Sequence, residues 1–321
     1  MGRKQGPRKG TLQFWPRKRA QKNISSVNWN ALKDTDKKGL LGFICYKVGM
    51  KSAYVKDATN DSMTKNKRIP IPVTIVECPT MKIFSVRLYK NKKVIGEVLN
   101  NNLDKELKKR VSIPKEYKTK ELLEKAEKEA DFDDIRVLVY SQVKKTGIKK
   151  SPDIGEVGLG GSKEEKLAFV KENLAKEISV SDVFAEGLVD ARGITIGKGT
   201  QGPVKRFGIR LRVRKAEKGQ RKVGSIGPWH PARVTFRTPF AGQMGFFNRI
   251  VYNNKIVFAG KISEKDINEE KGFHRYGKIK NDYLVLRGSI QGPSKRQLLL
   301  TETLRPTKKQ LKKNYEFIEL R

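Results

Sequence analysis

The chain has 321 residues, of which 70 are lysine or arginine and 34 are aspartate or glutamate, so its formal net charge is +36 at neutral pH. A self-repelling charge of this size requires a polyanion as partner, which excludes most enzymes of small acidic metabolites and most secreted folds and favours nucleic acid. Hydrophobic residues make up 37% of the chain and charged residues 32%, which is typical of a folded body with extended basic arms.

The cysteines and the hydropathy of the sequence indicate the compartment in which the protein is expected to work. Cys45 and Cys78 share no close spacing, so we expect no disulfide framework and a reducing compartment. The basic N-terminus is not followed by an apolar stretch, and no run of about 18 apolar residues occurs, so we expect neither a signal peptide nor a membrane anchor.

The charge is unevenly distributed along the chain. Net charges are +9 for residues 1–40, +7 for 41–100, zero for 101–189, +12 for 190–250 and +8 for 251–321. We interpret the neutral block as an inserted domain that faces away from the polyanion, because unpaired carboxylates on a phosphate-facing surface would weaken binding. The alternative is an ordinary solvated helix surface within one domain.

The first 22 residues carry eight basic side chains and no acid, and their glycines and prolines break any helix. This tail is expected to be disordered by itself. Phe14 and Trp15 lie between Lys9 and the run Pro16-Arg17-Lys18-Arg19. Two interpretations stay open: the two aromatic rings stack on nucleic-acid bases, or they dock on the protein's own core.

From Leu40 onward, short segments rich in β-branched and aromatic residues predict a barrel or a sandwich. The first five are 41–47, 52–56, 73–78, 83–89 and 94–98. The sequence Ile69-Pro70-Ile71-Pro72 marks an edge or the start of a strand, because proline cannot donate a hydrogen bond within a central strand.

The neutral block predicts a small α+β unit over residues 101–184. A helix at 121–130 and a strand at 135–140 precede a glycine-rich stretch from Gly155 to Gly161, interpreted as a flexible turn. Ser162 and Glu165 have the spacing of a capping box. The helix that follows places Leu167, Val170 and Leu174 on one face.

Further strands are predicted at 188–196, 233–238, 246–252, 256–262, 283–289, 298–303 and 317–320. The predicted fold is therefore mainly β, with a β-barrel split between residues 41–100 and 185–321 by the inserted α+β domain at 101–184. A basic N-terminal extension occupies residues 1–40, and a basic central extension occupies 203–232.

The segment Gly197-Lys198-Gly199-Thr200-Gln201-Gly202 matches G-x-G-x-x-G and follows a predicted strand. A dinucleotide site would need an apolar helix to begin here. Because Pro203-Val204-Lys205-Arg206-Phe207-Gly208 follows instead, we reject that interpretation. The glycines are more compatible with a close approach of the backbone to a phosphate chain.

The most unusual stretch runs from residue 203 to 232. It holds nine cations within eighteen residues, opposed only by Glu217. Arg210, Arg212 and Arg214 alternate with apolar residues, which on an extended strand would place all three guanidinium groups on one side. A ribbon that reaches into folded RNA fits this pattern better than the alternative, a solvated hairpin arm.

Trp229 and His230 follow within a turn rich in glycine and proline, which favours a displayed ring that stacks on a nucleotide over a core tryptophan. Catalytic signals are weak. His230 and His274 are the only histidines and have no metal-ligand spacing, and the carboxylates lie mostly in the neutral block. We therefore expect no enzyme activity, no metal and no cofactor.

Five segments resemble one family, the universal third protein of the large ribosomal subunit in its archaeal and eukaryotic form. They are GTLQFWPRKRA at 10–20, LGFICYKVGM at 41–50, GKGTQGPVKR at 197–206, RKVGSIGPWHPA at 221–232 and AGQMG at 241–245. The resemblance implies a split β-barrel of translation-factor type, an inserted α+β unit and two extensions that penetrate ribosomal RNA. It places Trp229 at the tip of the central extension, near the peptidyl transferase centre, with Arg221 and Lys222 along the stem.

The resemblance also implies early binding to the 3′ part of the large-subunit rRNA as an assembly nucleator, neighbouring large-subunit proteins as partners and a cytoplasmic location, without membrane or small-molecule substrate. Two positions depart from the family pattern. Glu217 stands where eukaryotic relatives carry a methylated histidine, and Thr200 stands where an aromatic residue is frequent. Two other classes stay open at this point: an RNA-modifying enzyme that uses the arms as a clamp, and a DNA-packaging protein.

The candidate rRNA-binding residues combine the cations of both extensions with the displayed aromatic and imidazole rings. They are Arg3, Lys4, Arg8, Lys9, Trp15, Arg17, Lys18, Arg19, Lys198, Lys205, Arg206, Arg210, Arg212, Arg214, Lys215, Lys218, Arg221, Lys222, Trp229 and His230.

Overall fold

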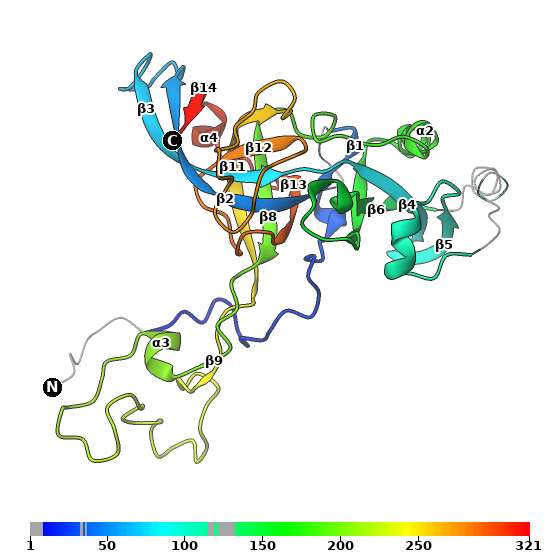
Figure 1. Cartoon of the computed structure of the whole chain (residues 1–321). Coiled ribbons are helices and arrows are strands. Elements are labelled where there is room, and N and C mark those ends of the chain that lie inside the picture. The colour runs from blue at the N-terminus through cyan, green and yellow to red at the C-terminus, as the bar shows by residue number, and fades with distance from the viewer. Residues whose placement is uncertain (1–8, 33–34, 36, 115–118, 120, 122–131) are drawn as a thin grey trace. The chain divides into compact units, whose positions relative to one another are not determined.

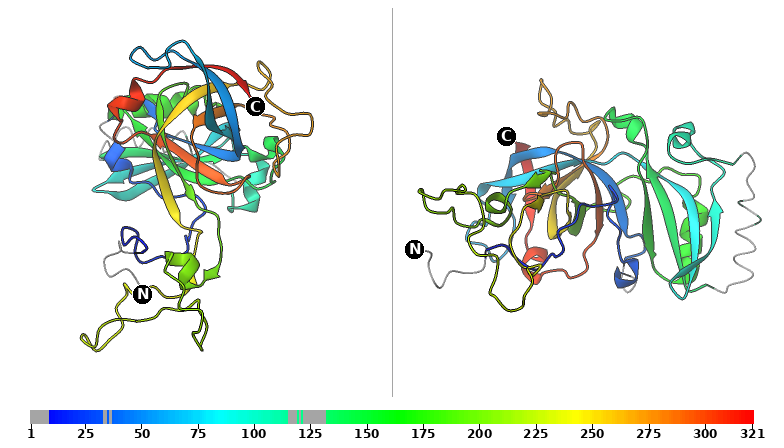
Figure 2. Two further views of the ribbon diagram at one scale, coloured as in Figure 1. Left: turned by 90° about the vertical axis from the view of Figure 1, so that its left-hand side faces the viewer. Right: turned by 90° about the horizontal axis from the view of Figure 1, so that it is seen from below.

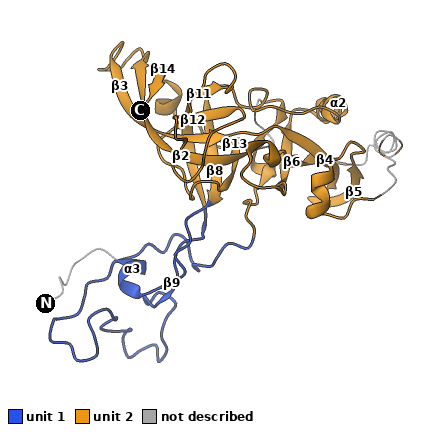
Figure 3. Ribbon diagram, viewed as in Figure 1, with its two compact units in different colours: residues 1–21, 194–248 blue, residues 22–193, 249–321 orange. Residues whose placement is uncertain are grey.

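The computed structural model describes residues 9–32, 35, 37–114, 119, 121 and 132–321. The described chain is mainly β, as predicted, and it divides into two compact units (Figure 3). Unit 1 consists of residues Met1–Gln21 and Ile194–Asn248, and unit 2 consists of Lys22–Gly193 and Arg249–Arg321.

The larger sheet of unit 2 has seven strands. Their order is β13 (Gln297–Glu302), β8 (Leu188–Ile194), β11 (Asn248–Gly260), β12 (Tyr283–Arg287), β3 (Arg68–Glu77), β2 (Gly42–Asp57) and β14 (Tyr315–Leu320). Strand β13 also pairs with β2, so the pairings of six strands return to their starting point (Figures 1 and 2). Strand β14 joins the outer half of β2.

Two pairs of predicted strands are each one continuous strand. The segments 41–47 and 52–56 both lie in β2, and 246–252 and 256–262 lie mostly in β11. The pairing of β2 with β3 shifts register between Lys47 and Gly49, which indicates a β-bulge. Strand β2 therefore continues past residue 47, where the first predicted segment ends.

The proline-rich start of β3 agrees with the sequence prediction. Residues 68–72 pair only with β2, because β12 pairs with Val73–Glu77. Pro70 and Pro72 therefore have a paired strand on one side only. Their missing amide donors are tolerated because no strand pairs on the other side.

The second sheet of unit 2 has the order β1 (Gly39–Leu40), β7 (Ile154–Gly160), β6 (Asp134–Ser141), β4 (Met81–Lys90) and β5 (Lys93–Leu99). The strands predicted at 83–89 and 94–98, which the sequence analysis assigned to the barrel, pair in this sheet and not with β2 or β3. The composition of a strand does not determine which strand pairs with it. In the structure, Val86 of β4 lies opposite Val137 of β6.

The glycine-rich stretch is not the flexible turn that the sequence predicted. Gly155, Gly158 and Gly160 belong to strand β7. A Cβ atom on Gly158 would lie 3.0 Å from the Trp29 ring, and one on Gly160 would lie 1.9 Å from the Lys37 carbonyl oxygen. These glycines allow close packing and do not mark a turn.

Helix α2 (Lys163–Asn173) begins as predicted. The Ser162 hydroxyl accepts a hydrogen bond from the Glu165 amide, and the Glu165 carboxylate accepts one from the Ser162 amide. Val170 is buried, and Leu167 and Leu174 pack against the same core cluster. The predicted helix at 121–130 lies outside the described residues except for Glu121.

The remaining elements are short. They are the 3₁₀ helices η1 (Trp29–Leu32), η2 (Lys105–Lys109) and η3 (Val143–Thr146), the helices α3 (Pro203–Phe207) and α4 (Lys308–Leu311), and the strands β9 (Thr200–Gln201) and β10 (Gly242–Gln243). The predicted strand at 233–238 is wrong: this segment is an irregular, largely exposed loop. Val234 and Phe236 do alternate with polar residues, but no strand of the described sheets pairs with this segment, so nothing holds it in an extended conformation.

Candidate RNA interface

Unit 1 concentrates positive charge. Its residue ranges contain 19 lysines and arginines, seven in the first range and twelve in the second, and Glu217 is their one acid. An isolated segment with this composition repels itself and lacks a large apolar core. Any ordered arrangement of unit 1 therefore depends on a small number of specific contacts.

The two strands of the central segment are held together where it leaves unit 2. Strand β9 pairs with β10, with Gln201 opposite Gly242. Beside this pair, the Lys198 amide donates to the Met244 carbonyl over 2.9 Å, and the Met244 amide donates to the Gly199 carbonyl over 2.9 Å. The G-x-G-x-x-G motif thus forms one side of a narrow β-ribbon.

The five-residue helix α3 follows this ribbon directly. Pro203 occupies its first turn, and Gly208 ends it in the left-handed conformation with a hydrogen bond to the Val204 carbonyl. A helix of one turn offers no stack of amides for a pyrophosphate, which agrees with the rejection of a dinucleotide site. Its buried residue is Phe207, on which Trp15 and Arg17 of the N-terminal tail pack.

The N-terminal tail folds over α3. The Trp15 ring stacks on Phe207 with a centroid distance of 5.8 Å and meets Phe236 edge-on at 5.9 Å. A Cβ atom on Gly10 would lie 2.4 Å from the Phe207 ring, so glycine permits this close approach. Of the two open interpretations for Trp15, docking on the protein is the one observed, within unit 1.

Two arginines fasten the tail to the central segment. The Arg17 guanidinium lies 4.4 Å from the Phe207 ring centroid and donates to the Arg206 carbonyl over 2.8 Å. The Arg206 side chain donates to the carbonyls of Gln243 and Phe240, each over 3.0 Å. Burial lowers the pKa of both guanidinium groups, and in Arg206 the nearby Arg17 adds to this effect.

Beyond α3, residues 208–241 form neither helix nor strand. The expected alternation of guanidinium groups on one strand face is therefore wrong. The Arg212 side chain turns back and donates to the Val223 carbonyl, whereas Arg210 and Arg214 are exposed. Because no neighbouring strand pairs with this segment, nothing imposes an extended conformation on its apolar and basic residues.

Trp229 is 87% exposed, with Ile226 and Val234 among the exposed apolar residues near it in the sequence. It belongs to an open cavity of about 400 Å³ that is lined by residues of the same turn, including Pro228 and Pro231. The core-tryptophan alternative is wrong. An exposed indole on a proline-rich turn leaves a flat apolar surface accessible to solvent.

Most candidate residues lie on the surface of unit 1. The exposed ones are Lys9, Lys18, Arg19, Lys198, Lys205, Arg210, Arg214, Lys215, Lys218, Arg221, Lys222, Trp229 and His230, and the half-buried ones are Trp15, Arg17, Arg206 and Arg212. Arg3, Lys4 and Arg8 lie outside the described residues. The sequence interpretation missed Arg233 and Arg237, which are exposed in the same unit. Both arginines were counted in the net charge of residues 190–250. They were not selected as candidates because residues 233–238 were predicted to form a strand.

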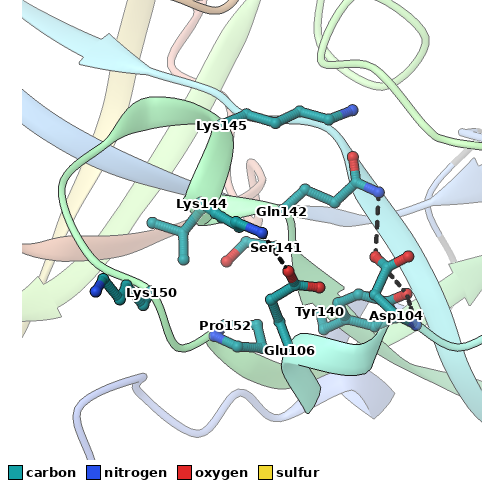
Figure 4. Close-up of a pocket in the computed structure, with 10 residues that line it drawn as sticks. Asp104, Glu106, Tyr140, Ser141, Gln142, Lys144, Lys145, Lys150 and Pro152 are labelled. Atoms are coloured by element: carbon teal, nitrogen blue, oxygen red, sulfur yellow. Dashed lines mark hydrogen bonds and ion pairs between the residues drawn. The ribbon is translucent and has the colours of Figure 1, made fainter. Parts of the chain in front are cut away.

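Unit 2 contains a small polar cavity of about 190 Å³ (Figure 4). Both of its carboxylates are already paired: Lys144 lies 2.6 Å from Glu106, and Tyr140 and Gln142 both donate to Asp104. The hydrogen bond from Lys144 lowers the pKa of Glu106. No carboxylate here is left free for acid–base chemistry.

Other features that would indicate catalysis or membrane insertion were sought among the described residues. No group of three or more His, Cys, Asp or Glu side chains is placed to hold a metal ion. In the same part of the chain, no helix is long and apolar enough to cross a membrane. Cys45 and Cys78 are buried free thiols.

Comparison with known proteins assigns the family. A family model described as ribosomal protein L3 matches residues 1–321. The chain belongs to the ribosomal protein L3 family. The resemblance found in the five sequence segments is thereby confirmed, and the protein is a structural component of the ribosome and not an enzyme.

Three archaeal relatives, each named large ribosomal subunit protein uL3, show the extent of the similarity. The protein of Methanobrevibacter smithii is 44% identical, with 96% of this chain and 95% of the relative covered. That of Methanosphaera stadtmanae is 42% identical, with 97% and 95% covered. That of Methanocaldococcus jannaschii is 40% identical, with 94% and 92% covered.

Proposed function

We propose that unit 1 is the part of this ribosomal L3 family protein that penetrates large-subunit rRNA, and that the protein works in the cytoplasmic large subunit beside neighbouring ribosomal proteins. The observation that carries the proposal is the charge of unit 1, in which 19 cations face one acid while most of the candidate side chains are exposed. Such a surface gains affinity by releasing counterions from phosphates.

The two parts of unit 1 have different roles in this proposal. The tail and α3 form a preorganised base, because Arg17, Arg206 and the ring of Phe207 fix one another. The irregular segment 208–241 becomes ordered against folded RNA, with Trp229 at its tip stacking on a nucleotide near the peptidyl transferase centre. Exposed Arg221 and Lys222 contact phosphates along the stem.

Unit 2 is the platform that carries these extensions. Its ring of six paired strands supports a split β-barrel of translation-factor type, and the five-stranded sheet with α2 supports an inserted α+β unit that begins near residue 81. Early contact with the 3′ part of the rRNA by a protein of this charge would hold distant helices together. We propose on this basis that the protein nucleates assembly of the subunit.

The test is equilibrium binding of the full chain to transcripts of the 5′ and the 3′ parts of the large-subunit rRNA over a range of salt concentrations. The logarithm of affinity should fall linearly with the logarithm of salt concentration, with a slope of about −0.7 to −0.9 per neutralised phosphate. Tighter binding to the 3′ transcript is expected. Equal binding to both transcripts, or a salt-independent affinity, would overturn the proposal.

A further inference from the structure

Unit 2 contains a basic cleft that the charge analysis did not single out. It lies where the loop between β2 and β3 meets α4 and the start of β14, elements that are labelled in Figure 1. The volume of the cleft is about 850 Å³. Its basic lining consists of Arg287, Lys309, Lys312 and Lys313. A cleft of this size accommodates a segment of a polymer and exceeds the needs of a single small ion.

Hydrogen bonds between the two sides of the cleft hold it in shape. The Ala58 amide donates to the Asn314 carbonyl over 3.0 Å, and the Asn314 amide donates to the Thr59 hydroxyl over 3.1 Å. Strand β14 pairs with the outer half of β2, with Tyr315 opposite Asp57. The loop and the lysines are therefore held on two sides of one opening.

Two acids, Asp57 and Asp61, also line the cleft, so its four cations exceed its acids by two. The carboxylate of Asp57 accepts hydrogen bonds from the Thr59 amide and from the hydroxyls of Ser62 and Thr64. Burial alone would raise the pKa of Asp57, but these hydrogen bonds outweigh it and lower the pKa. The carboxylate is thus used to order the loop.

The cations lie close enough to repel one another. Besides burial, the charges of Arg287 and Lys309 lower the pKa of Lys313, and nearby Asp57 only partly opposes them. Within the described part of the chain, Lys309, Lys312 and Lys313 have no ion pair. Arg287 is held in place over the Tyr315 ring at 5.4 Å and donates to Gln310 over 3.4 Å.

We propose that this cleft binds the phosphodiester backbone of an RNA strand, so that unit 2 has its own RNA site in addition to unit 1. Three lysines and one oriented arginine supply charge-assisted hydrogen bonds to phosphate oxygens, and the hydroxyl-rich loop lies beside them. RNA is favoured over an acidic protein segment because the proposal rests on the rRNA-binding function already proposed for this chain.

The test compares variants of the full chain that each lose three cations. The cleft variant is Lys309→Gln with Lys312→Gln and Lys313→Gln. Its matched control is Lys105→Gln with Lys108→Gln and Lys109→Gln, three exposed lysines of η2 that have no ion pair among the described residues. A third variant, Lys218→Gln with Arg221→Gln and Lys222→Gln, removes charge from unit 1. Thermal unfolding checks that each variant is folded. If the triple cleft variant does not fold, the double variant Lys309→Gln with Lys312→Gln, at two exposed positions, replaces it.

The measurement is the salt dependence of binding to large-subunit rRNA. If the cleft contacts phosphates, the cleft variant should flatten the slope by about 2 to 3, whereas the control should leave it nearly unchanged. A cleft variant with the slope of the control overturns the proposal. Loss of binding to an immobilised polyglutamate peptide with an unchanged RNA slope would overturn it in favour of a protein partner. If the unit 1 variant also keeps the wild-type slope, the proposed function itself fails.

Discussion

The guanidinium of Arg17 donates a hydrogen bond to the main-chain carbonyl of Arg206, across 189 positions of sequence. This contact joins the N-terminal tail to the short helix α3, and both arginines also lie over the ring of Phe207, at 4.4 and 5.0 Å. A tail that would be disordered by itself is thereby fixed beside the central segment. Arg206 in turn donates to the carbonyls of Gln243 and Phe240, so the junction also holds the end of the central segment.

The first prediction concerns this junction. The Arg17→Ala substitution removes the hydrogen bond and the contact with Phe207, so the tail should detach more often. Limited proteolysis of the free protein should cleave near residue 17 several times faster than in the wild type. Arg19→Ala, which removes an exposed cation of the same tail, serves as the control and should leave the cleavage rate nearly unchanged. Equal rates for both variants would show that the junction does not hold the tail.

The second prediction separates a tip residue from a core residue. Trp229 is 87% exposed, whereas Trp29 of η1 is 4% exposed and belongs to the main core cluster. Trp29→Ala should lower the free energy of unfolding by about 3 to 5 kcal/mol. Trp229→Ala should leave the unfolding temperature unchanged but weaken rRNA binding by about 1 to 3 kcal/mol.

Urea unfolding and rRNA binding, measured on both variants, check this pair of outcomes. Ribosomes that carry Trp229→Ala should in addition show altered peptidyl transfer or tRNA binding. A destabilised Trp229→Ala protein together with normally functioning ribosomes would place the functional tip elsewhere in unit 1.

The third prediction concerns the buried carboxylate of Glu77. One of its oxygens accepts hydrogen bonds from the amides of Lys280 and Asn281 and from the Asn281 side chain, and the other accepts the Tyr276 hydroxyl. Glu77→Ala leaves these donors without a partner, at a cost of about 1 to 3 kcal/mol for each group that stays buried. We expect a markedly lower urea midpoint. Glu264→Ala, on the surface, should change the free energy of unfolding by less than about 0.5 kcal/mol.

The fourth prediction compares two glycines that the sequence does not distinguish. In Gly160→Ala the new methyl group would meet the Lys37 carbonyl oxygen at 1.9 Å, so strand β7 or its neighbour must shift. Gly202→Ala meets nothing within 4 Å. The first variant should unfold at a clearly lower temperature and the second at the wild-type temperature. Similar unfolding temperatures would indicate that the backbone at Lys37 adapts freely.

Much of the fold was predictable because local patterns report local structure. The capping box at Ser162 and the proline-rich start of β3 are examples, since each depends on hydrogen bonds within a few residues or on a missing donor. The pairing of β4 and β5 was not predictable in this way. Their alternating apolar residues fit either sheet of unit 2, and only long-range packing selects β6 as the neighbour of β4.

The candidate interface divides in the same manner. Charge counts identified both basic extensions, because electrostatic repulsion acts whatever the conformation. They did not show that Arg206 and Arg212 turn inward to main-chain carbonyls, since that depends on backbone groups brought near by folding. The basic cleft escaped notice because its cations are scattered over β12 and the C-terminal segment.

By itself, the sequence determined that this protein is rich in β-strands, that its charge requires a polyanion and that its motifs are those of the ribosomal L3 family. These properties follow from composition and from short motifs, which do not change with the path of the chain. The tertiary structure decided which strands share a sheet, which glycines are packing sites and which cations face outward. Those features depend on residues far apart in sequence, such as Arg17 and Arg206 or Asp57 and Lys313, whose proximity arises only when the chain folds.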